Sequence, residues 1–517
     1  MAMVRPQHVK VLEVRPRVER VISFAQKGQM SRFEREVRAL ERARFALTRD
    51  ETVALARAAR LGGTMATGLR LLARVVRPRA RARITPTPAE EAEYALLLGA
   101  AGGQEEAFAI LGRHDPVRVP VVGYARALLE CWRFNWAGAL PFLEKLENYF
   151  PPRSMESLGV GGRLIASYLY GRGDTASAKR VLARMDREAD PDHSGTFFDD
   201  TFNFRVQIAL REGDLGTAGE AIREWHSHIE SSGHRGARLY ARQWEHILAF
   251  RRAPDPKAFD AGMAEVAREF RTGHLWFRGM ATEFYRATLA QNPRLLNRLY
   301  HACPHPSVRE GALKAFAPGT APDAWYGYVP GNPWDGPGGE RAGTPGGKWL
   351  ELAGLRSSWS KRPLRATTHV HRLLSAIALD LYEPPTVVGL HARVYPGERY
   401  HVSASPAKVR QLLKRLRDWI KAQKLDLRVM EEGGRYWLES RALEIRVKQG
   451  GVEDVRLGSR LARITEAVGP GDFAVSAAAR ALGVTPRSAL RVLTAGAEAG
   501  LAEQTGKGRG ARWRMKK

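Results

Sequence analysis

Six short turn signals, most of them about 40 residues apart, divide a long helix-patterned region of this 517-residue chain. They are Gly62-Gly63, Gly102-Gly103, Asn135-Trp136, Gly173-Asp174, Gly213-Asp214 and Pro254-Asp255. The stretches between them are rich in Ala, Leu, Arg and Glu, with apolar residues at helical spacing. A single helix pair cannot bury its apolar face alone, so neighbouring pairs must share a core. We therefore predict a mainly α fold, with an α-solenoid of stacked helix pairs over residues 46–316.

Three segments show the repeated unit most clearly: residues 124–146, 164–185 and 204–225. In each, an apolar helix ends at a turn, and a second helix opens with small residues where two helices must approach closely. These segments resemble tetratricopeptide repeats, and the spacing near 40 favours relatives with longer helices. The resemblance implies a concave surface that binds a protein, a peptide or an effector. Six aromatic residues are predicted to pack between repeats: Trp132, Trp136, Tyr168, Phe204, Trp225 and Trp244.

The basic charge of the chain is concentrated at its two ends. The formal net charge is +27. Residues 1–90 carry 20 basic and 8 acidic side chains, residues 91–350 carry 31 of each, and residues 351–517 carry 31 and 16. A general preference for Arg would raise the charge everywhere, so the neutral middle argues against that explanation. The pattern indicates polyanion-binding surfaces near the ends, and residues 1–45 are predicted to form a basic helical segment.

The composition changes abruptly at residues 317–347, where Pro and Gly dominate and a helix cannot persist. We predict a linker here, with aromatic residues suited to docking onto a neighbouring domain: Trp325, Tyr326, Tyr328 and Trp334. Residues 342–349 lack both the first Gly and the final Ser or Thr of a nucleotide-binding P-loop.

A mixed pattern of strands and helices follows over residues 348–450. Two short strand-like pieces precede a helix at 366–381, and the valines of residues 386–394 leave either a helix or a strand possible. A basic helix is predicted from Pro406, with Ser405 as its N-cap. Residues 425–440 then predict a strand, a Gly-Gly turn and a second strand.

Two parts of this region, VRQLLKRLRDW (residues 409–419) and GGRYWLE (residues 433–439), resemble the winged-helix effector domain of OmpR-type response regulators. The resemblance covers about residues 345–447. It implies a helix in the DNA major groove and a wing, the β-hairpin, on the adjacent backbone. By this resemblance the side chains that contact DNA are Lys408, Gln411, Lys414, Arg415 and Arg435.

The last segment, residues 455–517, carries a second pattern of this kind. Helices are predicted at 457–468 and 475–482, followed by a tight turn at Gly483-Val484 and a third helix that Thr485 caps. The sequence AAARALGVTPRSALRVLTAGAEAGLAEQTGKGRGARW closely resembles a bacterial winged helix-turn-helix. The resemblance predicts a core that includes Ala478, Gly483, Val484, Leu490, Leu493 and Leu501.

The same resemblance assigns the DNA contacts of this second domain. Base edges are expected at the start of the third helix, and phosphates along the basic wing. The predicted contact residues are Thr485, Arg487, Ser488, Arg491, Lys507, Arg509, Arg512 and Arg514.

Together these features predict a sequence-specific transcription regulator that binds double-stranded DNA, with a helical array that binds a partner. The alternative is a scaffold or architectural protein, in which the repeats and both winged helices contact proteins or bind DNA without sequence preference. A homo-oligomer is compatible with either role. Whether the protein activates or represses, and whether both winged helices bind DNA, stays open.

No catalytic or cofactor motif is found in the sequence. It has no HExxH, GxSxG or CxxC motif and no carboxylate pair at ligand spacing, so we expect neither an enzyme nor a bound cofactor or metal. The pair His226 and His228 would lie on different faces of a helix. Two cysteines, no apolar leader and no long apolar stretch predict a cytoplasmic, nucleoid-associated protein without membrane contact.

Overall fold

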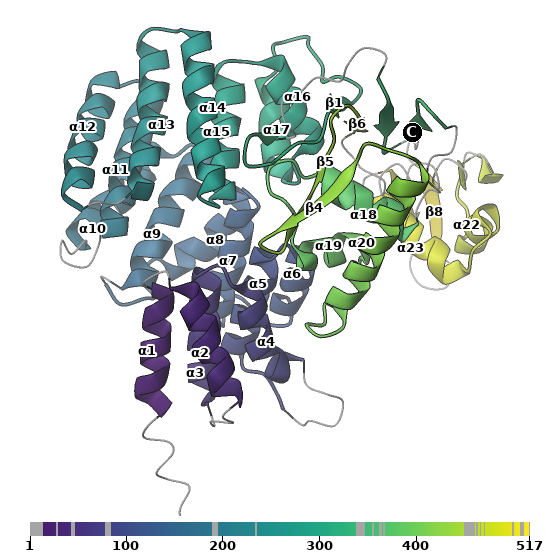
Figure 1. Cartoon of the computed structure of the whole chain (residues 1–517), viewed down its shortest axis with the longest axis horizontal. Helices are drawn as coiled ribbons and strands as arrows, with labels where there is room; N and C mark the ends of the chain where they lie inside the picture. Colours follow the sequence, from purple (N-terminus) through teal and green to yellow (C-terminus); the bar gives the residue numbers. More distant parts are fainter. Residues whose placement is uncertain are drawn as a thin grey trace, which may run out of the picture.

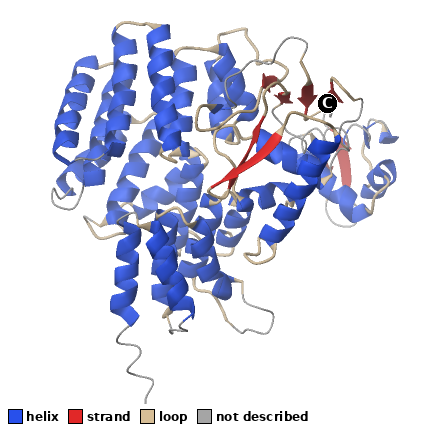
Figure 2. Cartoon of the chain, viewed as in Figure 1, coloured by secondary structure: helices blue, strands red, loops and turns tan. Residues whose placement is uncertain are grey.

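The computed structural model is mainly helical, with a few short strands beside the helices that follow residue 368 (Figure 1 and Figure 2). This confirms the predicted mainly α composition. None of the described helices is both long and apolar enough to cross a membrane. The structure describes residues 14–515 apart from 27–28, 43–46, 78–83, 153, 189–194, 233–234, 338–346, 354–355, 361–363, 365–367, 449–460, 462–463, 466, 470, 499–500 and 507–510.

Helices α1 to α17 form a unit that we call the helical array. Their bounds are α1 (Val14–Gln26), α2 (Met30–Arg42), α3 (Arg49–Leu61), α4 (Met65–Val76), α5 (Pro88–Ala100), α6 (Gln104–Leu111), α7 (Pro120–Trp132), α8 (Trp136–Leu146), α9 (Met155–Ser167), α10 (Thr175–Glu188), α11 (Gly195–Glu212), α12 (Leu215–Ser232), α13 (Arg235–Arg252), α14 (Pro256–Thr272), α15 (Trp276–Leu289), α16 (Pro293–Ala302) and α17 (Pro306–Ala315). A π-helical turn, η2 (Tyr168–Arg172), continues α9. All six predicted turn signals lie at junctions between consecutive helices.

Local capping explains where several of these helices begin. Thr48 and Thr87 each accept a hydrogen bond from the backbone of a Glu three residues later, and that Glu side chain returns the contact. This reciprocal capping box satisfies two N–H groups that a helix N-terminus leaves unpaired. Proline stands at the start of α5, α7, α14, α16 and α17, where its missing N–H costs nothing.

The N-terminal helices are part of the array and not a separate segment. Phe33, Val37 and Leu40 of α2 are buried with Leu55 of α3 and Leu71 of α4. The apolar stripe of α2 therefore decides its position, and its alternating charges are left on the outside.

Helices α18 (His369–Ala378), α19 (Val387–Val394) and α20 (Ser405–Ala422) follow the array. The region at 386–394, for which a strand was also possible, is a helix capped by Thr386. Ser405 is the first helical residue of α20 and not its cap, and its hydroxyl accepts a hydrogen bond from the His401 N–H. We call residues 348–447 the α18–α20 module.

A four-stranded sheet joins this module to the segment before it. Its strands lie in the order β1 (Tyr326–Tyr328), β6 (Glu444–Val447), β2 (Trp349–Glu351) and β3 (Arg356–Ser357). Strand β1 pairs antiparallel with β6, so Tyr326 lies opposite Val447. The predicted linker at 317–347 therefore contributes an edge strand, because Tyr326 and Tyr328 bury their rings in the core that α16, α17 and α18 share.

A β-hairpin follows α20, as predicted. Strands β4 (Arg428–Glu432) and β5 (Arg435–Glu439) are joined by Gly433 and Gly434, which both have positive φ. This is the two-residue turn for which the Gly-Gly pair is suited. The Tyr436 N–H donates to the Pro385 carbonyl, which attaches the hairpin to the start of α19.

The array curls so that helices far apart in sequence meet. The rings of Phe134, after α7, and Phe277, in α15, are stacked with centroids 4.1 Å apart. The hydroxyl groups of Tyr170 and Tyr285 are 2.5 Å apart. The first helices of successive pairs line the inner side of this curve, and the α18–α20 module packs beside both α5 and α16 (Figure 1).

Two chain turns meet closely where the array contacts the α18–α20 module. The Thr386 hydroxyl donates to the Ala101 carbonyl at 2.5 Å. A Cβ on Gly102 would lie 2.9 Å from the Gly389 Cα, and Gly102 also has φ +94°. Gly63, at the equivalent turn between α3 and α4, has φ +78° with no atom within 4 Å of such a Cβ.

This difference provides a matched test of the array–module contact. Both Gly63→Ala and Gly102→Ala should cost about 1 kcal/mol from the positive φ. Only Gly102→Ala should also push α19 away, so we expect faster hydrogen–deuterium exchange at residues 387–394 in that variant alone. Equal exchange in the two variants would contradict this packing.

Charged side chains form a buried cluster in α14 to α16. Glu283 is 1% exposed and contacts the guanidinium groups of Arg271, Arg286 and Arg298 at 3.1, 3.3 and 2.7 Å. Burial alone would raise the pKa of Glu283, but the three guanidinium groups hold that pKa below its ordinary value. Arg298 also donates to the Tyr382 hydroxyl, which links the cluster to the α18–α20 module.

Helices α22 (Val475–Leu482) and α23 (Pro486–Glu498) and strands β7 (Ala502–Thr505) and β8 (Arg512–Met515) form the C-terminal module. Its core combines helical residues Leu461 and Ile464 with Leu493 and Trp513, and is separate from the core of the array. Strand β8 pairs with β7 and, through Trp513, with Phe473.

Candidate functional site

The turn between α22 and α23 sets the angle at which α23 is presented. Gly483 ends α22 in the left-handed region at φ 64°. The Val484 N–H then donates back to the Ala479 carbonyl, which is the pattern of a Schellman cap. Thr485 caps α23, as predicted, because its hydroxyl accepts a hydrogen bond from the Ser488 N–H at 3.3 Å.

One face of α23 is buried and the other is open. Ala489, Val492 and Leu493 are in the module core. Arg487 and Arg491, one helical turn apart, are exposed, and neither forms an ion pair with any described residue. The i,i+4 spacing places the two guanidinium groups side by side on the outer face.

Three residues predicted for this core lie outside it. Gly483, at the turn, is exposed. Leu490 is 43% exposed and Leu501 is 45% exposed. Leu490 follows Ala489 on the helix, and with Ala489 turned inward its side chain must point outward. It stands between Arg487 and Arg491 in the sequence and gives the exposed side of α23 one apolar group. Ala478 and Leu493 are fully buried, as predicted.

The β7–β8 hairpin supplies the remaining basic side chains of this surface. Arg512 is exposed, whereas Arg514 forms a 2.7 Å ion pair with Asp472. Lys507 and Arg509, which were predicted to contact phosphates, lie outside the described residues. The alternating burial of β8 leaves Trp513 inside, so Arg512 and Arg514 share the opposite face.

The basic face of α20 is also exposed. Lys408, Gln411, Lys414 and Arg415 are all on the surface, with Val409, Leu412 and Leu416 buried beneath. Lys408 forms an ion pair with Glu398. The apolar residues of α20 therefore form one buried stripe beneath its basic face.

Arg435, the fifth predicted contact of this module, lies against protein. Its guanidinium donates to Glu383 at 2.9 Å and to the Pro384 carbonyl at 2.8 Å, and it lies over the ring of Trp276 in the array. The neighbouring Trp437 packs edge-on against Trp334. Side chains alternate along β5, so Arg435 and Trp437 point toward Trp276 and Trp334. Tyr436 and Leu438 point the other way, into the core that α18 and α20 share.

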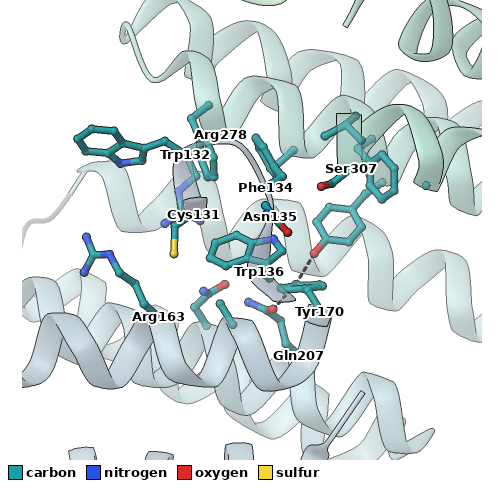
Figure 3. A pocket seen from close by; sticks show the side chains of 18 of the residues that line it. Cys131, Trp132, Phe134, Asn135, Trp136, Arg163, Tyr170, Gln207, Arg278 and Ser307 are labelled. Atoms are coloured by element: carbon teal, nitrogen blue, oxygen red, sulfur yellow. Dashed lines mark hydrogen bonds between the residues drawn. The ribbon is translucent and has the colours of Figure 1, made fainter. Parts of the chain in front are cut away.

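A pocket of about 900 Å³ lies on the inner side of the curved array (Figure 3). Helices α7, α9, α11, α13, α15 and α17 line it, together with Glu383 and Arg435 from the α18–α20 module. Trp132 and Trp136, predicted as packing residues, are partly exposed here and line the pocket. Tyr168, Phe204, Trp225 and Trp244 are buried, as expected for packing, although Phe204 and Trp244 also line the pocket.

The surroundings of the pocket shift several pKa values. Burial lowers the pKa of His305 to about 4, so this ring is neutral at pH 7. Burial raises the pKa of Glu383, against the opposing effect of Arg435. Burial also raises the pKa of the Cys131 thiol to about 12, which keeps it in the unreactive protonated form.

The described residues contain no group of three or more His, Cys, Asp or Glu side chains that could hold a metal ion. His226 instead forms a hydrogen bond with Glu245. Comparison with known proteins gave no match to a family model, a curated protein or a solved structure.

Proposed function

We propose that the protein is a sequence-specific DNA-binding transcription regulator, and that its C-terminal module is a winged helix-turn-helix. The observation that carries this proposal is the outer face of α23, where Arg487 and Arg491 are exposed without ion-pair partners among the described residues. Arginine side chains at this spacing can reach the O6 and N7 acceptors of guanine in the major groove. Leu490 between them offers an apolar contact for a thymine methyl group.

The distribution of charge supports the same role. Residues 351–517 have 31 basic and 16 acidic side chains, and Arg512 extends the basic surface from α23 onto the hairpin. Phosphate contacts of this kind position a protein on DNA, while the helix reads the bases. The helical array would then bind an effector or a partner protein as an α-solenoid. A regulator of this kind binds chromosomal DNA in the cytoplasm.

In vitro selection from random duplex DNA tests the proposal. We expect the full chain, at about 0.15 M salt, to enrich a shared motif of a few base pairs, since specific binding exceeds non-specific binding by orders of magnitude. A chain that lacks residues 456–517 should lose the motif. Recovery of all sequences with equal efficiency would contradict a sequence-specific regulator.

The docked β4–β5 hairpin favours a second candidate, a scaffold protein. Arg435 and Trp437 contact Trp276 and Trp334, and the outer strand carries Glu431 and Glu432. Acidic side chains on a wing would repel phosphates. Under this alternative the α18–α20 module serves protein contacts, and DNA binding by α23 shows no sequence preference.

A further inference from the structure

Contacts between helices that are distant in sequence border the pocket inside the array. The Phe134–Phe277 stack joins the turn after α7 to α15, and the Tyr170–Tyr285 contact joins η2 to the same helix. Its volume of about 900 Å³ falls within the range of small-molecule sites. Figure 3 shows Trp136, Tyr170 and Gln207 gathered around it, with Arg163 at one side.

Two aromatic side chains enter this pocket from positions where the backbone is strained. Most turns of the array place glycine in the left-handed region, at Gly63, Gly102, Gly173 and Gly213. At two pocket turns the residue in this conformation is instead Phe134 or His274, each with φ 59°. A residue with a Cβ pays a conformational cost there. Gln291, before α16, shares this conformation but lies outside the pocket, whereas Phe134 and His274 both line it.

Two polar groups at the edge of the pocket have different surroundings. The indole N–H of Trp276 is itself buried and has no hydrogen-bond partner in the described structure. Tyr170 is 42% exposed, yet burial raises its pKa. Tyr170 lines the pocket, and its hydroxyl contacts Gln207 and Tyr285.

The charges of the pocket favour an anion. Arg163 and Arg278 line it without an ion-pair partner among the described residues; Arg163 donates to the Gly159 carbonyl, and Arg278 lies over the Tyr240 ring. Arg435 is paired with Glu383. The other charged lining residues are Lys314, Asp200 and Glu310. A partly buried guanidinium gains most from an anionic partner.

We propose that this pocket binds a small planar anion, that is, a ligand with an aromatic ring system and a negatively charged group. The aromatic side chains contact the ring system, and Arg163 and Arg278 bind the charged group. Because Arg435 and Glu383 also line the pocket, the ligand lies against the β4–β5 hairpin. Any effect of this ligand on DNA rests on the proposed function, whereas ligand binding itself does not.

Fluorescence titration of the full chain without DNA tests this inference. The probe is 8-anilino-1-naphthalenesulfonate, an aromatic anion that contains a planar naphthalene ring system, and its uncharged counterpart is N-phenyl-1-naphthylamine. We expect saturable binding of the anion at one site. Arg163→Gln and Arg278→Gln should each weaken it about tenfold, with less than about a twofold effect on the uncharged probe.

Two further variants separate specific binding from general attraction to a basic protein. Arg118→Gln removes an exposed charge outside the pocket, and anion affinity should not change. Phe134→Gly removes a pocket ring at a position where glycine suits the backbone, so helical content should persist while both probes bind less well. Equal losses from Arg118→Gln and Arg278→Gln, or no loss from Phe134→Gly, would overturn the assignment.

Competition then identifies the kind of anion. Displacement of the probe by adenosine monophosphate indicates a nucleotide, and displacement by 2-naphthoate indicates an aromatic carboxylate. Displacement by neither would contradict a planar-anion site. A chain that binds these probes but no DNA would disprove the proposed regulator and leave the pocket assignment intact.

Discussion

The Glu283→Ala variant is expected to lose about 3–5 kcal/mol of stability, because removing one partner of a buried ion cluster leaves uncompensated charge. Glu283 contacts three guanidinium groups, of which those of Arg271 and Arg298 are almost completely buried. Asp260, the other carboxylate of the cluster, pairs with Arg286 at 2.7 Å. The variant would leave three buried cations near a single carboxylate.

Urea unfolding followed by circular dichroism measures this loss, and hydrogen–deuterium exchange should locate it in α14 to α16. The matched control is Glu265→Ala, since Glu265 is 51% exposed and its ion pair with Arg242 is a surface contact. Exposed pairs of this kind contribute about 0–1 kcal/mol. A Glu283→Ala midpoint equal to that of the control would contradict our account of the cluster.

The stability that Glu283 provides should also depend on pH. Its pKa is lower in the folded chain than its ordinary value. The contribution is therefore complete above the unfolded-state pKa and is lost as the pH falls through the folded-state pKa. At acid pH, the difference in unfolding free energy between the original chain and the Glu283→Ala variant should therefore be smaller.

The second large effect is expected at α23. Arg487→Ala and Arg491→Ala should each weaken binding to the selected DNA motif by about 1–3 kcal/mol, or roughly 5- to 150-fold, if these side chains read guanine. Affinity for unrelated DNA should change much less. Binding isotherms on motif and scrambled duplexes, measured at several salt concentrations, provide the test.

Salt dependence distinguishes base contacts from phosphate contacts in this experiment. Loss of a phosphate contact lowers the salt slope by about 1, whereas loss of a base contact leaves it nearly unchanged. Arg512→Ala, on the hairpin, should show the first behaviour. Arg118→Ala, in the array, is the control. If both α23 variants bind the motif with unchanged affinity, the proposal that α23 contacts the bases is refuted.

Local features of the chain were predictable because they depend on a few adjacent residues. Helix α22 has the predicted bounds, and Gly483 and Thr485 end it and start α23 as the sequence indicates. Gly433 and Gly434 likewise form the predicted hairpin turn. The turn before α16 was missed, since Gln291 is left-handed there instead of a glycine.

Features that join distant parts of the chain were not predictable in the same way. The pairing of Tyr326 with Val447 and the stacking of Phe134 on Phe277 depend on the path of the whole array. The pocket follows from that path as well, so Trp132 and Trp136 gave no local sign that they line a cavity. Arg435 was predicted to contact DNA because the hairpin resembles a wing. The burial of Tyr436 and Leu438 in the module core instead turns Arg435 and Trp437 toward Trp276 and Trp334.

The pairing of β1 with β6 limits where gene recombination can divide this chain without disrupting its fold. A recombination event that moved only residues 348–450 would separate β6 from β1 and leave Ile445 and Leu350 without the α16 and α17 side of their core. The exchange point that preserves every described contact of this core lies after Val447. Residues 461–515, with a core of their own, are therefore the part of the chain that evolution could most readily replace, giving the same array and pocket a different target.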